Sequence, residues 1–181
     1  VLVVINDDIH GSRGVTKTST TDVQTFVSAE RGLMGATLYG ENRYFRHPYR
    51  KHTADSELSV AGLDAMPRVD VIYISAGASA DLIDAAVAAG AKGIVTAGVG
   101  NGNMPAGSLA AVERAIARGV VVVRSTRVTS GTVGRNVETD DDAMGTIASG
   151  ELNPAQARVL LKLVLLKTSD RVLVQNYFDE Y

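Results

Sequence analysis

From residue 68 onward, short and long apolar segments alternate, and this alternation limits the fold more than any other feature of the sequence. The long segments carry apolar residues on one helical face and stop at Gly90 and Gly119, with Ser79 and Ser108 as their expected N-caps. Strands joined through helices by short connections form a parallel sheet with right-handed crossovers. The short β-branched runs predict its strands at residues 69–75, 93–97 and 120–123.

The clearest helix signal follows a loop at residues 126–150. Asn153 is an expected N-cap, Pro154 suits the first helical position, and Gln156 lies where a capping box requires it. Burying a large apolar side chain stabilises a fold by roughly 1.5–3 kcal/mol, so the apolar face of this helix should cover the sheet. A last helix is expected from about residue 169 to 181. Residues 68–181 are therefore predicted to form an α/β fold, a three-layer α/β/α sandwich with a parallel sheet. The apolar face comprises Ala157, Leu160, Leu161, Val164 and Leu165.

The first 67 residues lack this alternation. Residues 1–6 open with five consecutive apolar residues, which predicts a strand buried on both faces. Such a strand needs neighbours on either side, so the chain is interpreted as a fragment or a processed product. Residues 7–31 are interpreted as a long polar connection with a short helix near residues 23–28. The remaining segments are a predicted β-hairpin at residues 33–47, with its turn at residues 40–42, and a linker at residues 48–67.

Composition excludes several classes of function. The formal net charge is −2, which offers no basic footprint for nucleic acid, and no Lys/Arg cluster suggests a membrane surface. No apolar run approaches the roughly 20 residues of a membrane span. Cysteine is absent, so disulfides and thiol chemistry are excluded. His10, His47 and His52 show no metal-ligand spacing and are expected to be surface residues.

Two loops follow the carboxyl ends of predicted strands, where open parallel sheets bind ligands. The first, residues 97–103 (AGVGNGN), has glycines that allow close backbone approach and two amide side chains, but no phosphate-loop lysine. A tight turn and a binding loop explain it equally well. The second loop carries Glu138 and an acidic run at residues 140–142. The run lacks calcium-loop spacing, which favours a solvated loop over a metal site. Glu138 alone is a candidate for receiving a substrate ammonium.

A third candidate is residues 15–22 (VTKTSTTD), where Lys17 stands among hydroxyl side chains. A lysine in this setting can accept a proton or hold a hydroxyl network in place. A capped polar turn is the alternative interpretation. On these residues alone, the capped polar turn is the favoured interpretation.

Four segments resemble the bacterial type II L-asparaginases and glutaminase-asparaginases, and they occur in the order of that family. The resemblance covers essentially the whole chain, and four motifs in order are far more specific than any one of them. The segments are residues 15–22 (VTKTSTTD), 97–103 (AGVGNGN), 123–127 (VRSTR) and 152–161 (LNPAQARVLL).

The resemblance implies hydrolysis of L-asparagine to L-aspartate and ammonia, with L-glutamine as a side substrate. It places the threonine nucleophile upstream of Val1, so the chain alone is expected to be inactive. It implies that Lys17 is catalytic, as the lysine of a Thr-Lys-Asp group that activates a hydroxyl. It implies that Asn103 and Glu138 bind substrate. Asn103 supports binding across a subunit interface, and Glu138 receives the α-ammonium.

The resemblance also implies an organisation. Residues 1–47 correspond to the tail of a large amino-terminal domain, residues 48–67 to the interdomain linker, and residues 68–181 to the small carboxy-terminal domain. Family members are tetramers built as dimers of dimers, with each site shared between chains. They bind L-asparagine or L-aspartate and need no metal or organic cofactor. Type II members are exported, so a periplasmic or secreted location is expected.

The sequence leaves two alternatives to the asparaginase interpretation. A non-catalytic amino-acid binding module could use the same loops as a clamp. The residues upstream of Val1 would separate the two, because the enzyme requires its threonines there. A subunit acting on aminoacyl-tRNA fits poorly with the acidic charge balance.

Overall fold

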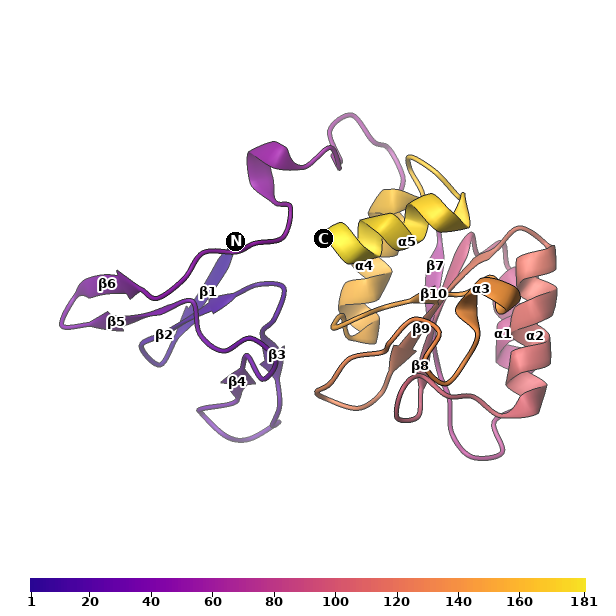
Figure 1. Cartoon of the computed structure of the whole chain (residues 1–181), viewed down its shortest axis with the longest axis horizontal. Helices are drawn as coiled ribbons and strands as arrows, with labels where there is room; N and C mark the ends of the chain where they lie inside the picture. The colour runs from indigo at the N-terminus through magenta and orange to yellow at the C-terminus, as the bar shows by residue number, and fades with distance from the viewer. The chain divides into compact units, whose positions relative to one another are not determined.

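A computed structural model describes all 181 residues, which divide into two compact units. The first unit contains residues 1–51 and 129–131, and the second contains residues 52–128 and 132–181. Figure 1 labels the helices and strands of both units and colours the chain from its N-terminus to its C-terminus. None of the helices combines the length and the apolar character that a membrane span requires.

The second unit is built on a parallel sheet. Its strands are β7 (Val69–Tyr73), β8 (Gly93–Gly98), β9 (Val121–Thr126) and β10 (Ile147–Ala148). They are ordered β10-β9-β8-β7, and all pair in parallel. Both β8 and β9 are buried along their entire length, as expected for central strands covered on two faces.

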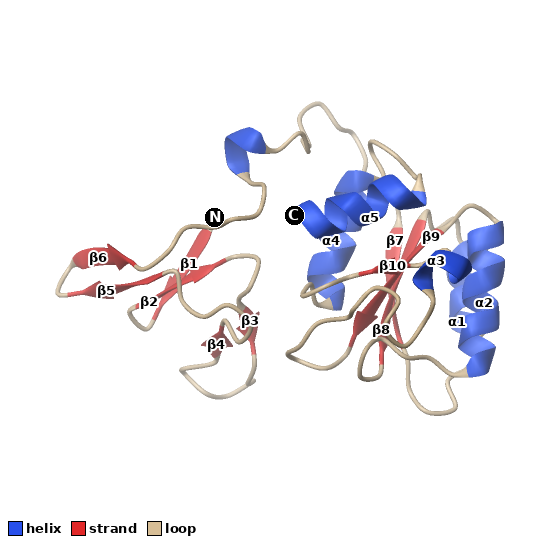
Figure 2. Ribbon diagram, viewed as in Figure 1, coloured by secondary structure: helices blue, strands red, loops and turns tan.

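Helices cover both faces of this sheet (Figure 2). On one face lie α1 (Asp81–Ala88) and α2 (Ala106–Ala117), and on the other lie α4 (Pro154–Val164) and α5 (Arg171–Glu180). Each pair closes its own apolar core. The first core includes Ile83, Ile94 and Val122, and the second includes Val95, Leu161 and Phe178. The predicted three-layer α/β/α sandwich is confirmed.

Of the three helix N-caps expected from the sequence, one is present as predicted and two are not. The capping box of α4 is present, with Gln156 N donating to Asn153 Oδ1 (3.0 Å) and Asn153 N donating to Gln156 Oε1 (3.1 Å). Ser79 does not occupy the N-cap of α1, which is Ala80, although its hydroxyl accepts from Asp81 N (3.1 Å). The expected cap at Ser108 is wrong, because the N-cap of α2 is Pro105, three residues earlier, and the helix encloses Ser108.

The first unit contains two antiparallel sheets. The larger is ordered β1-β2-β5-β6 and the smaller pairs β3 with β4. The hairpin predicted at residues 33–47 is confirmed, but its turn lies at Tyr39 and Gly40 and not at residues 40–42. The φ values of 54° and 81° at these two residues suit a two-residue hairpin. The strands are β1 (Leu2–Ile5), β2 (Asp8–Gly11), β3 (Thr16–Lys17), β4 (Phe26–Val27), β5 (Gly35–Leu38) and β6 (Glu41–Tyr44).

Two expectations for this unit are wrong. The first strand lies at a sheet edge and is not buried on both faces, since Val4 is 59% exposed. The short helix expected near residues 23–28 is a strand, because Phe26 and Val27 pair with Lys17 and Thr16. A pairing of this range cannot be recognised from local periodicity. Between β6 and β7, the predicted linker contains one short 3₁₀ helix, η1 (Thr53–Asp55).

Candidate functional site

The loop after β8 is a tight turn that presents Asn103. Val99 N donates to Asn103 O (3.0 Å), and Asn103 N donates to Val99 O (2.8 Å). The backbone doubles back so closely that a Cβ on Gly98 would lie 2.5 Å from the carbonyl carbon of Gly102. Only glycine fits there, and Gly102 itself has a φ of 78°. The turn therefore fixes Asn103 beside the carboxyl end of β8.

Asn103 contacts Glu138, which lies in the loop between β9 and β10. The Asn103 Nδ2 donates to Glu138 Oε2. Asn103 is half-buried, and Glu138 is exposed. One amide donor orients the carboxylate and leaves its other acceptor positions open to solvent. Such an oriented carboxylate can accept hydrogen bonds from a ligand ammonium. The structure thus brings two of the three predicted site residues together.

A buried ion pair lies behind this contact. Arg124 on β9 and Asp141 have no exposed side-chain surface, and their two hydrogen bonds measure 2.6 and 2.7 Å. Asp141 starts α3 (Asp141–Met144) and also accepts from Thr146 Oγ1 (2.5 Å) and Asn136 N (2.9 Å). Both carboxylate oxygens are therefore fully hydrogen-bonded.

The acidic run at residues 140–142 was expected to be a solvated loop, and that expectation is wrong for Asp141, which is buried, whereas Asp140 and Asp142 are exposed. Asp140 caps α3 by accepting from Ala143 N (2.9 Å), and Asp142 is exposed and pairs with Arg135. Burial opposes ionisation of Asp141, but the hydrogen bonds from Arg124, Thr146 and the Asn136 backbone outweigh it. Together they hold the pKa of Asp141 below its ordinary value. The available sequence signal was an arginine directly after four valines, since a buried cation requires a partner.

Lys17 lies in the first unit, on β3. Its side chain is exposed, with Nζ 5.7 Å from the centroid of the Phe26 ring. Hydroxyl groups close the loop that follows it. Thr18 Oγ1 donates to Thr25 O (2.9 Å), Ser19 N donates to the buried Thr25 Oγ1 (2.7 Å), and that hydroxyl donates to Ser19 O (2.6 Å). These bonds agree with the interpretation of the segment as a capped polar turn, and the side chain of Lys17 is exposed beside it.

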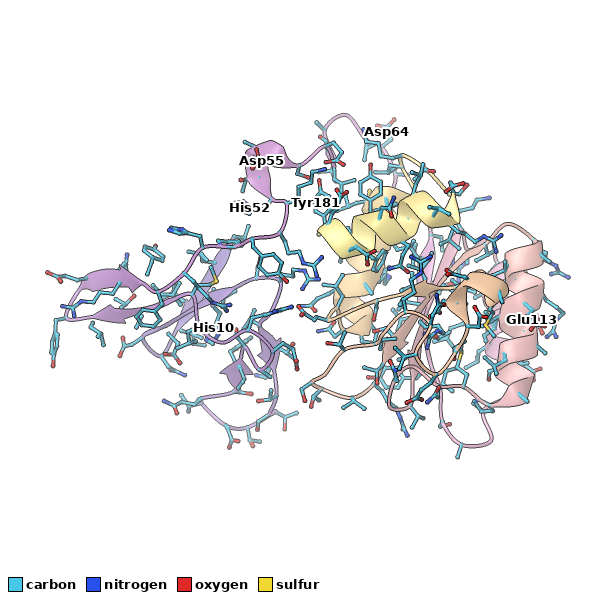
Figure 3. All side chains as sticks on the ribbon, viewed as in Figure 1. His10, His52, Asp55, Asp64, Glu113 and Tyr181 are labelled. Carbon is cyan, nitrogen blue, oxygen red and sulfur yellow. The ribbon has the colours of Figure 1, made fainter.

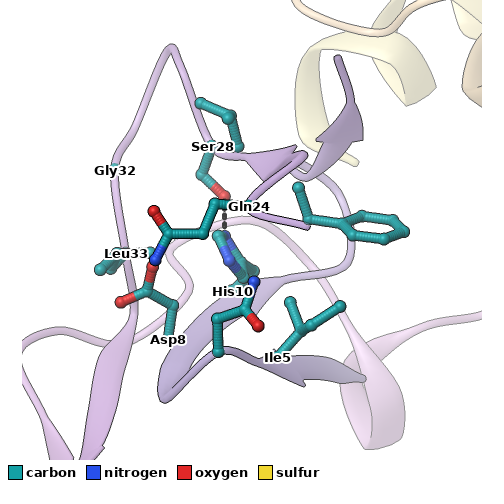
Figure 4. Close-up of a pocket in the computed structure, with 10 residues that line it drawn as sticks. Ile5, Asp8, His10, Gln24, Ser28, Gly32 and Leu33 are labelled. Carbon is teal, nitrogen blue, oxygen red and sulfur yellow. Dashed lines mark hydrogen bonds between the residues drawn. The ribbon is translucent and has the colours of Figure 1, made fainter. Parts of the chain in front are cut away.

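Of the three histidines, His47 and His52 are exposed, as expected, but His10 is 1% exposed. His10 lies among the strands of the first unit (Figure 3). Its Nδ1 shares a hydrogen bond of 2.9 Å with Ser28 Oγ, and its Nε2 has no partner. The ring borders a cavity of about 270 Å³ that Asp8 and Gln24 also line (Figure 4). No cluster of His, Cys, Asp and Glu with metal-binding geometry occurs in the chain.

Comparison with known proteins identifies the second unit. Residues 68–178 match the family model described as the Glutaminase/Asparaginase C-terminal domain. The matched segment begins just before β7 and ends within α5, so it contains the sandwich except for the last two residues of α5. Asn103, Arg124, Glu138 and Asp141 all lie inside it.

Curated relatives match the full chain. It is 46% identical over 181 residues to a probable periplasmic L-asparaginase of Haemophilus influenzae and 45% identical over 181 residues to L-asparaginase 2 of Escherichia coli. It is 40% identical over 185 residues to a glutaminase-asparaginase of Acinetobacter glutaminasificans. These alignments cover 100% of this chain but 52%, 52% and 55% of the relatives. The chain therefore spans about half the length of the curated relatives it matches.

Proposed function

The chain belongs to the glutaminase/asparaginase family, and from this premise we propose that it is the carboxy-terminal part of an enzyme that hydrolyses L-asparagine to L-aspartate and ammonia. The observation that carries the proposal is the contact between Asn103 and Glu138. It places an oriented carboxylate, suited to an α-ammonium group, at the carboxyl end of a parallel sheet.

The proposed reaction divides its work between the two units. Glu138 binds the substrate α-ammonium, and Asn103 orients Glu138. Lys17 belongs to a group that activates a threonine hydroxyl in the upstream part of the enzyme. That hydroxyl attacks the side-chain amide carbon, and its proton passes to the amide nitrogen, which leaves as ammonia. Water then hydrolyses the resulting ester, which releases aspartate and restores the hydroxyl. Each step transfers protons between side chains and water, and none requires a metal or an organic cofactor.

The proposed organisation extends to the whole protein. Residues 1–47 belong to the large amino-terminal domain, residues 48–67 form the linker, and residues 68–181 form the small domain. The enzyme assembles as a tetramer in which Asn103 and Glu138 of one chain face Lys17 of another. The Haemophilus influenzae relative is named periplasmic, which supports an exported location. The Acinetobacter relative is named a glutaminase-asparaginase, which supports L-glutamine as a side substrate.

The division of the site predicts the behaviour of the chain alone. The purified chain of 181 residues should release no ammonia from L-asparagine, whereas the full-length protein that carries it should turn over. Ammonia release, measured with a coupled assay on both samples at equal chain concentration, tests this directly. Turnover by the chain alone would contradict the proposal. Binding of L-aspartate by the full-length protein without any ammonia release would identify a binding module instead.

Glu138→Gln in the full-length protein tests the ammonium site. We expect KM for L-asparagine to rise by about 10- to 150-fold, which corresponds to the roughly 1.5–3 kcal/mol of a hydrogen bond to a charged group. Steady-state ammonia release gives both KM and kcat. Glu113→Gln, on the exposed side of α2, is the matched control and should leave both unchanged. An unchanged KM in Glu138→Gln would remove Glu138 from the site.

A further inference from the structure

We propose that Arg124 and Asp141 are positioning residues for the ammonium site, and that this buried pair holds Asn103 and Glu138 against each other. The inference rests on the proposed function and assigns a role to two residues that do not contact the open face of Glu138. Its basis is that the pair binds the backbone of both loops on which Asn103 and Glu138 stand.

On the Asn103 side, Arg124 reaches into the glycine turn. Its Nη1 donates to Asn101 O (2.9 Å), two residues before Asn103. The guanidinium lies so close to the turn that a Cβ on Gly102 would be 3.1 Å from Nη1. The side chain of Asn101 extends the link, because its Oδ1 accepts from Gly134 N (2.8 Å). The turn is thereby bonded to the loop that carries Glu138.

On the Glu138 side, the same pair holds the loop backbone at two points. Arg124 Nη2 donates to Gly134 O (3.2 Å), and Asp141 Oδ2 accepts from Asn136 N (2.9 Å). Asn136 lies two residues before Glu138 and has a φ of 57°, a conformation that asparagine tolerates better than most residues. The side chain of Asn136 donates to Asp142 Oδ2 (2.8 Å) and closes the loop over α3.

Stability alone does not explain why this pair is buried. Removing two charges from water costs several kcal/mol per ion, and well-packed apolar replacements of both partners are often neutral or stabilising. What an apolar pair cannot do is donate to Asn101 O and Gly134 O and accept from Asn136 N at once. A planar guanidinium with five donors can bridge three segments, whereas a lysine offers a single charged point. The contacts therefore indicate positioning.

The double variant Arg124→Met/Asp141→Leu separates positioning from stability, because it leaves no unpaired charge in the core. In the full-length enzyme we expect it to fold and to raise KM for L-asparagine about 10- to 100-fold, since a misplacement of about 1 Å can cost about 100-fold. The change in kcat should be smaller, because the upstream nucleophile is untouched. Arg124→Lys keeps the charge but loses the planar set of donors that the guanidinium provides. It should also raise KM, and it takes the place of the double variant in this test if the double variant does not fold.

The matched control is a second ion pair on the same unit. Arg114 on α2 and Asp84 on α1 are 2.6 Å apart and about half exposed, and their side chains hydrogen-bond to each other. Arg114→Met/Asp84→Leu removes an equal set of charges and should leave KM and kcat unchanged. A rise in KM confined to the buried pair supports the proposal.

A direct structural measurement distinguishes failure of this inference from failure of the proposed function. In ¹⁵N-labelled full-length protein, the Asn103 side-chain amide should show a hydrogen-bonded proton whose signal is lost in Arg124→Met/Asp141→Leu. In Glu138→Gln the signal should only shift, because the glutamine amide oxygen is a neutral acceptor. A folded double variant that keeps the wild-type Asn103 signals and the wild-type KM would overturn the positioning role. An unchanged KM in Glu138→Gln, with the Asn103 signal still lost in the double variant, would overturn the ammonium site itself, while showing that the buried pair holds Asn103 and Glu138 together.

Discussion

Lys17→Met in the full-length enzyme is expected to lower kcat for L-asparagine by about 100- to 10,000-fold, the range that a positioned acid–base group contributes. The reason is that methionine matches the length of the lysine stem but can neither carry nor accept a proton. Rapid measurement of ammonia release at saturating L-asparagine gives kcat. Lys92→Met, at an exposed lysine just before β8, is the control and should retain wild-type kcat.

The structure explains why Lys17→Met should fold. The pairing of β3 with β4 uses backbone groups, and the loop after Lys17 is closed by Thr18, Ser19 and Thr25 rather than by the ammonium. The side chain is exposed, so its replacement leaves no cavity in a core. A wild-type kcat in this variant would exclude Lys17 from catalysis.

Arg124→Met alone should have the largest effect on stability. It leaves the Asp141 carboxylate buried without its cation, and breaking a buried pair in this way costs about 3–5 kcal/mol. Urea unfolding of the chain, followed by circular dichroism, measures the loss in free energy of unfolding. Arg114→Met is the exposed counterpart and should shift the unfolding midpoint only slightly.

The stability of Arg124→Met/Asp141→Leu, compared with that of Arg124→Met, tests the cause of this loss. Adding Asp141→Leu to Arg124→Met removes the unpaired charge and should restore most of the lost stability. A single variant as stable as the wild-type chain would contradict the buried pairing. A double variant less stable than the single variant would show that the pair contributes more to the fold than its desolvation cost removes.

Local signals predicted the sandwich well. β8 and β9 are covered on both faces, so their positions appear as unbroken apolar runs, and α4 carries its capping box in three residues, Asn153, Pro154 and Gln156. The same local reasoning failed where a long-range partner decides the structure. Phe26 is in a strand because Lys17 pairs with it, and nothing within residues 23–28 encodes that pairing.

The candidate site shows the same limit. Composition left the loop at residues 97–103 undecided between a tight turn and a binding loop, and the structure shows a tight turn that also presents Asn103. Lys17, Asn103 and Glu138 were selected by their resemblance to a family. The Arg124–Asp141 pair was missed, because its partners are 17 residues apart and the acidic run around Asp141 is typical of a solvated loop. His10 was misplaced for the same reason, since its partner is Ser28 on a different segment.

A crystal structure of the full-length assembly with L-aspartate bound tests the central claim most directly. The account predicts that the ligand α-ammonium lies within hydrogen-bond distance of a Glu138 carboxylate oxygen that Asn103 orients, and that Lys17 of a neighbouring chain lies beside the threonine hydroxyl facing the ligand side chain. Aspartate bound away from Glu138, or Lys17 remote from every bound ligand in the assembly, would contradict it.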